Sequence, residues 1–120
     1  MSRAKYLEIS IKDVKWKVFS QSPSYYKKVH KKLADSHGIT YIDDCEVYFP
    51  RIGVHINIVR HELIHMLVAS SSTNRMTETT ADDREEHIAQ LIEHHYEDIG
   101  KWSIEIHTFL MQQLNKGNHK

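Results

Sequence analysis

The sequence contains a single cysteine, Cys45, among its 120 residues. One cysteine excludes a disulfide bond within the chain, and it excludes the cysteine-based clusters that hold structural zinc. A lone cysteine is also typical of proteins in a reducing compartment. Any bound metal ion must therefore be held by histidine and carboxylate side chains, and the chain has 10 histidines.

The sequence also lacks a charge excess and a long apolar run. Lys and Arg together number 16, as do Asp and Glu, so the formal net charge is 0. A neutral chain has no long-range field to recruit nucleic acid or an anionic membrane. There is no stretch of about 18 apolar residues, and residues 1–5 lead straight into an alternating pattern without the apolar core of a signal peptide. We expect a cytoplasmic protein without a membrane partner.

Alternation near the N-terminus predicts a β-hairpin. Apolar and polar residues alternate over residues 7–11 and again over 14–18, which is the period of half-buried strands. Lys12 and Asp13 lie between the two runs, where they can form the turn.

Residues 23–36 are predicted to form an amphipathic helix. Pro23 suits its first turn. Tyr25, Val29 and Leu33 recur at spacing four and would form its buried face.

A second hairpin on the same sheet is expected next. The β-rich runs 39–42 and 45–49 flank Asp43-Asp44. The strand at 46–49 is either an exposed sheet edge that pairs with an extended substrate or an ordinary inner strand.

In the second half of the chain the spacing of apolar residues changes from that of strands to that of helices. Residues 58–69, with Asn57 as a plausible N-cap, are apolar on most of a helix circumference, which is typical of a buried central helix. This helix also contains His61, Glu62 and His65.

Two further helices are predicted after a loop. The loop is residues 70–77, which are rich in Ser, Thr and Asn. A helix begins after Thr80 and breaks near Tyr96, and a last helix carries apolar residues over 99–110. Residues 115–120 are expected to fray as a polar tail.

The chemistry is concentrated in His61-Glu62-Leu63-Ile64-His65, an HExxH motif. Residues four apart share a helix face, so both imidazoles can bind one ion at about 2.0–2.1 Å, the usual Zn–N distance. Glu62 lies about 100° around the axis from His61, so its carboxylate can reach a water on the metal without ligating the metal. Zinc lowers the pKa of such a water towards about 7, and a carboxylate can take the proton. The alternative is a histidine-rich helix surface whose polar groups face water or pair with one another.

A peptidase site needs a third zinc ligand, and the helix after the loop is the best place for it. Glu85 and Glu86 lie 20 and 21 residues after His65 (85−65 and 86−65). We favour Glu86, then Glu85, then Glu93, although an ordinary solvated carboxylate is the default for each. Imidazole is an equally good zinc donor, so three histidines are rival ligands: His87, His94 and His95.

The chain resembles small phage- and prophage-encoded zinc metallopeptidases of the gluzincin kind in four segments. These are 38–42 (GITYI), 46–49 (EVYF), 60–66 (RHELIHM) and 85–93 (EEHIAQLIE), and the likeness spans residues 6–114. The chain lacks the Gly-x-x-His that follows the motif in metzincins and the cysteine ligands of zinc ribbons.

The resemblance implies a ligand set and a fold. In that group the third ligand is a glutamate early in the next helix, often in a Glu-x-x-Ala setting, which Glu86-His-Ile-Ala89 matches. The implied site is Zn²⁺ held by His61, His65 and Glu86. The implied location is the cytoplasm, which includes the cytoplasm of a phage-infected host cell. The expected fold class is α+β, a single minimal zincin-like domain over 1–120. Two hairpins would form a small mixed sheet, packed with the HExxH helix beneath it and two C-terminal helices.

A zincin also needs a group that stabilises the tetrahedral oxyanion. Five residues are candidates by type alone: Tyr48, His55, His94, His95 and Tyr96.

Three functions follow from these patterns. The leading one is a zinc-dependent peptidase acting on an extended segment of a protein or peptide. The second is a binding module that keeps zinc for structure. The third is a nucleic-acid-associated metalloprotein, which the neutral charge disfavours and which would use a basic face made of Lys27, Lys28, Lys31 and Lys32. An open coordination position favours the first, a closed four-ligand site the second, and salt-dependent DNA binding the third.

Overall fold

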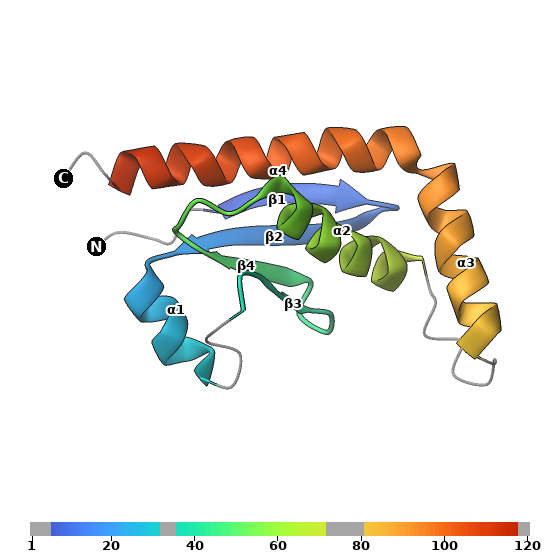
Figure 1. Cartoon of the computed structure of the whole chain (residues 1–120), viewed down its shortest axis with the longest axis horizontal. Coiled ribbons are helices and arrows are strands. Elements are labelled where there is room, and N and C mark those ends of the chain that lie inside the picture. Colours follow the sequence, from blue (N-terminus) through green and yellow to red (C-terminus); the bar gives the residue numbers. More distant parts are fainter. Residues whose placement is uncertain (1–5, 32–35, 72–80, 118–120) are drawn as a thin grey trace.

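The computed structural model describes residues 6–31, 36–71 and 81–117, and of residues 81–85 and 117 it describes the backbone alone. Within these ranges the chain is a small α+β domain with a four-stranded mixed sheet and four helices (Figure 1). The strands are β1 (Tyr6–Ile11), β2 (Val14–Gln21), β3 (Ile39–Tyr41) and β4 (Glu46–Pro50). The helices are α1 (Pro23–Val29), α2 (Ile56–Ser70), α3 (Ala81–His94) and α4 (Tyr96–Gly117). No helix in the described ranges is long and apolar enough to cross a membrane.

The predicted N-terminal hairpin is confirmed. Strands β1 and β2 pair antiparallel, with Ile11 opposite Val14 at the turn. The two turn residues, Lys12 and Asp13, have φ angles of 51° and 68°. A two-residue type I′ turn requires positive φ at both positions, and its twist matches that of the flanking strands.

The second hairpin is also confirmed, and the strand order settles which strand lies at the edge. Strands β3 and β4 pair antiparallel, and β4 pairs parallel to β2. The order in the sheet is β1-β2-β4-β3. The strand over 46–49 is therefore an inner strand, and β3 is the edge beside it.

The hydrophobic core lies between one face of the sheet and the two helices α2 and α4, which pack against each other and contact the sheet (Figure 1). Alternate residues of the strands point into it, because successive side chains of a strand face opposite sides. Complete burial of a Leu or Phe side chain stabilises the fold by about 1.5–3 kcal/mol. The largest fully buried side chains of the core are Trp16, Phe49, Ile11, Leu63, Met66, Leu67 and Ile106.

The HExxH helix α2 packs into the core as predicted, but only one side of it is buried, and His61 and His65 lie on its exposed side. Val59, Leu63 and Met66 are each 0% exposed on its inner side. Its N-cap is not Asn57 but His55, whose Nδ1 accepts a hydrogen bond from the Asn57 N–H at 3.0 Å. The helix therefore starts two residues earlier than the sequence indicated.

The prediction of a long amphipathic helix over 23–36 is wrong in length and in face. Helix α1 ends at Val29. Tyr25 is 54% exposed and Val29 49% exposed, so the apolar spacing does not mark the buried side. Leu33, the third residue of that pattern, lies outside the described residues.

The buried side of α1 is made by a tyrosine and a histidine. Tyr26 is 1% exposed, and His30, the C-cap, is 5% exposed. His30 Nδ1 lies 2.6 Å from the Tyr41 hydroxyl, and its Nε2 lies 3.0 Å from Gln21 Oε1. Buried polar groups require hydrogen bonds, and these two partners supply them to the His30 ring. A polar side chain can therefore be buried here, where the periodicity suggested an apolar one.

The C-terminal half follows the prediction except at its end. Helix α3 stops at His94 and α4 begins at Tyr96, which confirms the break. Helix α4 runs to Gly117, so residues 115–117 are helical and not a frayed tail. The buried side chain of Gln113 shows that packing continues past residue 110. Residues 72–80, with most of the predicted loop and the cap at Thr80, and residues 118–120 lie outside the described residues.

Candidate metal and catalytic site

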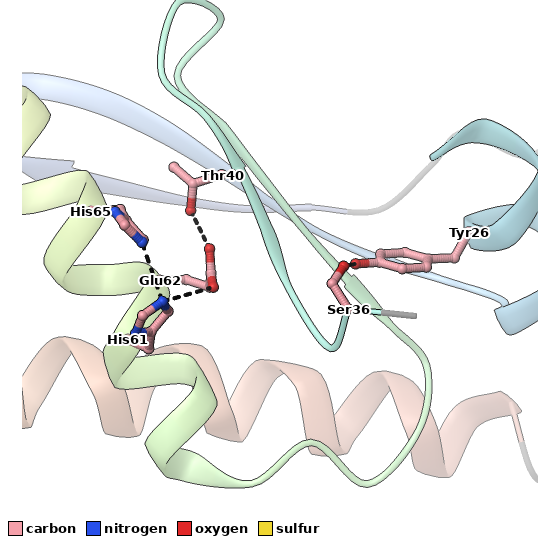
Figure 2. Close-up of polar contacts among 6 residues, drawn as sticks. All are labelled: Tyr26, Ser36, Thr40, His61, Glu62 and His65. Carbon is pink, nitrogen blue, oxygen red and sulfur yellow. Dashed lines mark hydrogen bonds and ion pairs between the residues drawn. The ribbon is translucent and has the colours of Figure 1, made fainter. Parts of the chain in front are cut away.

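The two histidines of the HExxH motif converge, as the spacing predicts. His61 Nε2 lies 3.2 Å from His65 Nε2, with the rings nearly perpendicular (Figure 2). Both residues are exposed, and the side chain of His61 is 69% exposed. The pair is therefore accessible from solvent.

The separation of these nitrogens suits a zinc ion. Two ligands at the usual Zn–N distance, in tetrahedral geometry, have nitrogens about 3.3 Å apart. The observed 3.2 Å is close to that separation, and in the structure it is a hydrogen bond between the two imidazoles, in which one Nε2 donates to the other. Neutral imidazole presents one lone pair in the ring plane, so the pair can supply two of the donors that zinc needs.

Glu62 lies between the histidine pair and the sheet edge. The residue is 7% exposed, and its Oε1 accepts a hydrogen bond from Thr40 Oγ1 at 2.6 Å (Figure 2). Its Oε2 is 4.0 Å from His61 Nε2. A buried carboxylate requires such a partner because an unpaired buried charge is costly. One carboxylate oxygen is thus held by β3 while the other faces the histidines.

Gly38 leaves room for that carboxylate. A Cβ atom at position 38 would lie 3.0 Å from Glu62 Cγ and 2.9 Å from Phe49 Cε1. Contacts this short force a neighbour to move. The segment leading into β3 therefore approaches Glu62 more closely than any other residue type would allow.

An open hollow of about 330 Å³ separates β3 from α2 beside these groups. It is lined by Ser36, Gly38, Ile39, Thr40, Ile42, Glu62 and His65. A carboxylate, an imidazole and a sheet edge thus face one solvent-accessible space.

A tyrosine hydroxyl lies near this hollow. The Tyr26 hydroxyl is 2.9 Å from Ser36 Oγ (Figure 2). Burial raises the pKa of Tyr26, and the negative charge of Glu62 raises it further, while the hydrogen bond with Ser36 lowers it. Tyr26 therefore stays neutral within electrostatic reach of Glu62.

The structure does not bring the predicted third ligand to the histidine pair. Glu86 is exposed on α3, and the described residues contain no group of three His, Cys, Asp or Glu able to hold a metal. The side chain of Glu85 lies outside the described part of the chain. Glu93 is exposed, as is His94. The third ligand therefore stays a prediction.

His87, another rival ligand, differs from its neighbours on α3. Its side chain is partly buried, and its Nε2 is shielded from solvent with no hydrogen-bond partner among the described residues. The neighbouring carboxylates Glu86 and Glu93 are exposed.

Two of the oxyanion candidates sit apart from the hollow. Tyr48 lies on the opposite face of β4 from Phe49, and its hydroxyl donates to Glu46 Oε1 at 2.6 Å. Burial, followed by this contact with Glu46, raises the pKa of Tyr48. His55 is engaged as the N-cap of α2.

The other three candidates lie at the junction of α3 and α4. His95 Nδ1 is 3.6 Å from Asp98 Oδ2, and its ring stacks on Trp102. Tyr96, which is 75% exposed, lines a separate hollow beside Arg60. Neither these two nor His94 is among the described residues that line the hollow between β3 and α2.

The basic residues proposed for nucleic acid lie on and after α1. Lys27, Lys28 and Lys31 are exposed, and Lys32 lies outside the described residues. Helix α1 packs against β4, whereas the histidine pair belongs to α2 (Figure 1).

Sequence reasoning missed Thr40, Gly38, Tyr26 and Ser36. Alternation within β3 places Thr40 on the face opposite to Ile39 and Tyr41, but it does not show that α2 covers that face. No signal marks Tyr26, since the spacing pointed to Tyr25.

Comparisons with family models, with curated proteins and with solved structures found no match to this chain.

Proposed function

We propose that this chain is a zinc-dependent peptidase, a minimal zincin-like hydrolase with Glu62 as its general base. The observation that carries the proposal is the 3.2 Å separation of His61 Nε2 and His65 Nε2, one helical turn apart. It is close to the ligand spacing of a tetrahedral zinc site, and the neighbouring residue, Glu62, carries a buried carboxylate.

Zinc at such a site acidifies water and polarises a carbonyl group. Glu62 Oε2 takes the proton of the attacking water, because Oε1 is already engaged by Thr40. Water adds to the carbonyl carbon, the C–N bond breaks, and the proton passes from Glu62 to the leaving amine. General acid–base transfer of this kind contributes roughly 10²- to 10⁴-fold to a rate.

We propose Glu86 of α3 as the third ligand, completing the set with His61 and His65. Helix α3, which carries Glu86, packs against α2. A catalytic zinc site has three protein ligands and one open position, which sets this function apart from a zinc-stabilised binding module.

The substrate that suits the hollow is an extended segment of a protein. Strand β3 is a sheet edge, and an edge offers backbone groups with which an extended chain can pair. Ile42, 55% exposed at the rim, adds apolar surface for a side chain of that segment. We place this activity in the cytoplasm.

The test is cleavage of a peptide library by the purified chain, read by mass spectrometry. We expect cleavage with zinc, none with a chelator, and recovery when zinc is added back. The double variant His61→Ala/His65→Ala is the matched control and should lose both stoichiometric zinc and cleavage. Unchanged zinc content in that variant would contradict the ligand assignment. Zinc binding without cleavage of the library or of a host lysate would favour a binding module.

A further inference from the structure

We infer that β3 and the residue before it orient the catalytic base: Thr40 holds Oε1 of the Glu62 carboxylate, Gly38 leaves the space for its methylene groups, and Oε2 is turned towards the histidine pair. Both are positioning residues, and the inference rests on the proposed function of Glu62. Neither was among the candidates that the sequence offered.

The hydrogen bond from Thr40 fixes one oxygen. Its 2.6 Å length is typical of an O–H donor on a charged acceptor, which is a strong type of hydrogen bond. Thr40 is itself held by the sheet, opposite Val47 of β4. The donor therefore has a position set by β-pairing and not by α2, which carries the base.

The absence of a side chain at Gly38 leaves the space that the methylene part of Glu62 occupies. The Gly38 backbone leaves space for Glu62 Cγ, because a Cβ atom at position 38 would lie only 3.0 Å from that carbon. The Phe49 ring also borders this space, with its Cε1 2.9 Å from the same Cβ position. Phe49 is 1% exposed in the core, so it cannot withdraw without opening a cavity.

As a consequence, Oε2 is the oxygen of Glu62 that is left to act as the base. A free Glu side chain rotates about three bonds, and ordering it has an entropic cost. In this fold the Glu62 side chain is ordered before substrate binds, because Oε1 accepts the hydrogen bond from Thr40 and Oε2 remains 4.0 Å from His61 Nε2. The position of the base should affect kcat more than KM, since a misplacement of about 1 Å can lower a rate about 10²-fold.

The first test separates kcat from KM. Thr40→Val keeps the shape but removes the donor, Thr40→Ser keeps the donor, and Thr108→Val is a matched control at an exposed site on α4. We expect Thr40→Val to lower kcat about 10- to 100-fold with KM within about twofold and zinc content unchanged. Thr40→Ser should restore most of kcat. A Thr40→Val enzyme with wild-type kcat, or a Thr40→Ser enzyme as slow as Thr40→Val, overturns the inference.

The second test needs no substrate. Melting temperatures of wild type, Thr40→Val, Glu62→Ala and the double variant form a cycle that reports the coupling of the two side chains. We expect the double variant to lose less than the sum of the single losses. Additive losses overturn the inference whatever the activity of the protein.

These outcomes distinguish the two claims. If Glu62→Gln keeps full turnover, the proposed function fails. If Glu62→Gln loses turnover while Thr40→Val does not, the function stands and the positioning role of β3 fails.

Discussion

The indole N–H of Trp16 donates a hydrogen bond to Ser70 Oγ at 2.8 Å, joining the middle of the sheet to the last residue of α2. Trp16 is 1% exposed. The contact spans 54 positions of the sequence and anchors the end of the helix that carries the HExxH motif.

Removing this hydroxyl should destabilise the whole fold. Ser70→Ala leaves the buried indole N–H without its acceptor, which costs about 1–3 kcal/mol. Urea denaturation measures the change, with Ser10→Ala at an exposed site on β1 as the control. Equal stability of the two variants would show that Ser70 is not an essential acceptor.

A methyl group at Gly38 should be tolerated less well than one at Gly53. A Cβ at Gly38 would meet Phe49 and Glu62 at 3.0 Å or less, whereas one at Gly53 meets nothing within 4 Å. Overpacking of a core costs about 1–3 kcal/mol. We expect Gly38→Ala to lower the free energy of unfolding by that amount and Gly53→Ala to leave it nearly unchanged. Similar effects of both substitutions would contradict the close approach of Gly38 to the base.

The stability of the protein should fall on acidification because of His30. Burial lowers the pKa of His30 below its usual value of 6.5. The unfolded chain then binds more protons than the folded chain in the window below about pH 6.5, so stability rises with pH through that window. The slope from one group is at most about 1.4 kcal/mol per pH unit. Above pH 6.5 this term is flat.

Urea denaturation between pH 5 and pH 7.5 measures how the free energy of unfolding changes with pH. Both limits lie about one unit or more from the usual histidine pKa of 6.5. His30→Gln should show a shallower dependence than wild type, while His37→Gln, at an exposed site, should match wild type. Equal slopes for wild type and His30→Gln would assign the effect to another group.

The third zinc ligand can be found by paired substitutions on α3. If Glu86 is the ligand, Glu86→Ala should weaken zinc affinity by roughly 10- to 100-fold or more, as loss of metal-site groups does. Glu85→Ala should leave the affinity unchanged. Competition with a chromogenic chelator gives both values. The reverse result would move the ligand by one residue, and no effect from either would direct attention to Glu93 and His87.

The sequence was most informative where local chemistry decides the structure. The Lys12-Asp13 turn, the break before Tyr96 and the HExxH helix each depend on neighbouring residues alone. The convergence of His61 and His65 follows from helical spacing in the same way.

The remaining features depend on contacts between distant segments. The parallel pairing of β2 with β4 makes β4 an inner strand, and it brings Phe19 and Tyr48 into a ring stack with centroids 4.8 Å apart. Nothing within either strand specifies that partner. The burial of His30 likewise requires an acceptor, Gln21 Oε1, and a donor, the Tyr41 hydroxyl, which come from two other segments of the chain. The sequence of α1 does not show these partners, and its short apolar repeat therefore led to the wrong buried face.

The positioning of Glu62 was hidden for a similar reason. A single threonine and a single glycine in a β-rich segment have many ordinary explanations, and their role appears only when α2 packs beside β3. The third ligand shows the same limit, because spacing after His65 cannot tell which face of α3 is turned towards α2.

The most direct test of a peptidase with Glu62 as base is the substitution Glu62→Gln, assayed for zinc content, melting temperature and cleavage. The amide oxygen can still accept the hydrogen bond from Thr40, so the fold and the zinc should be retained. Turnover should fall by at least about 10²-fold, because the proton acceptor is gone. A Glu62→Gln protein that cleaves every substrate as the wild type does would contradict the account and leave a zinc-binding interaction module in its place.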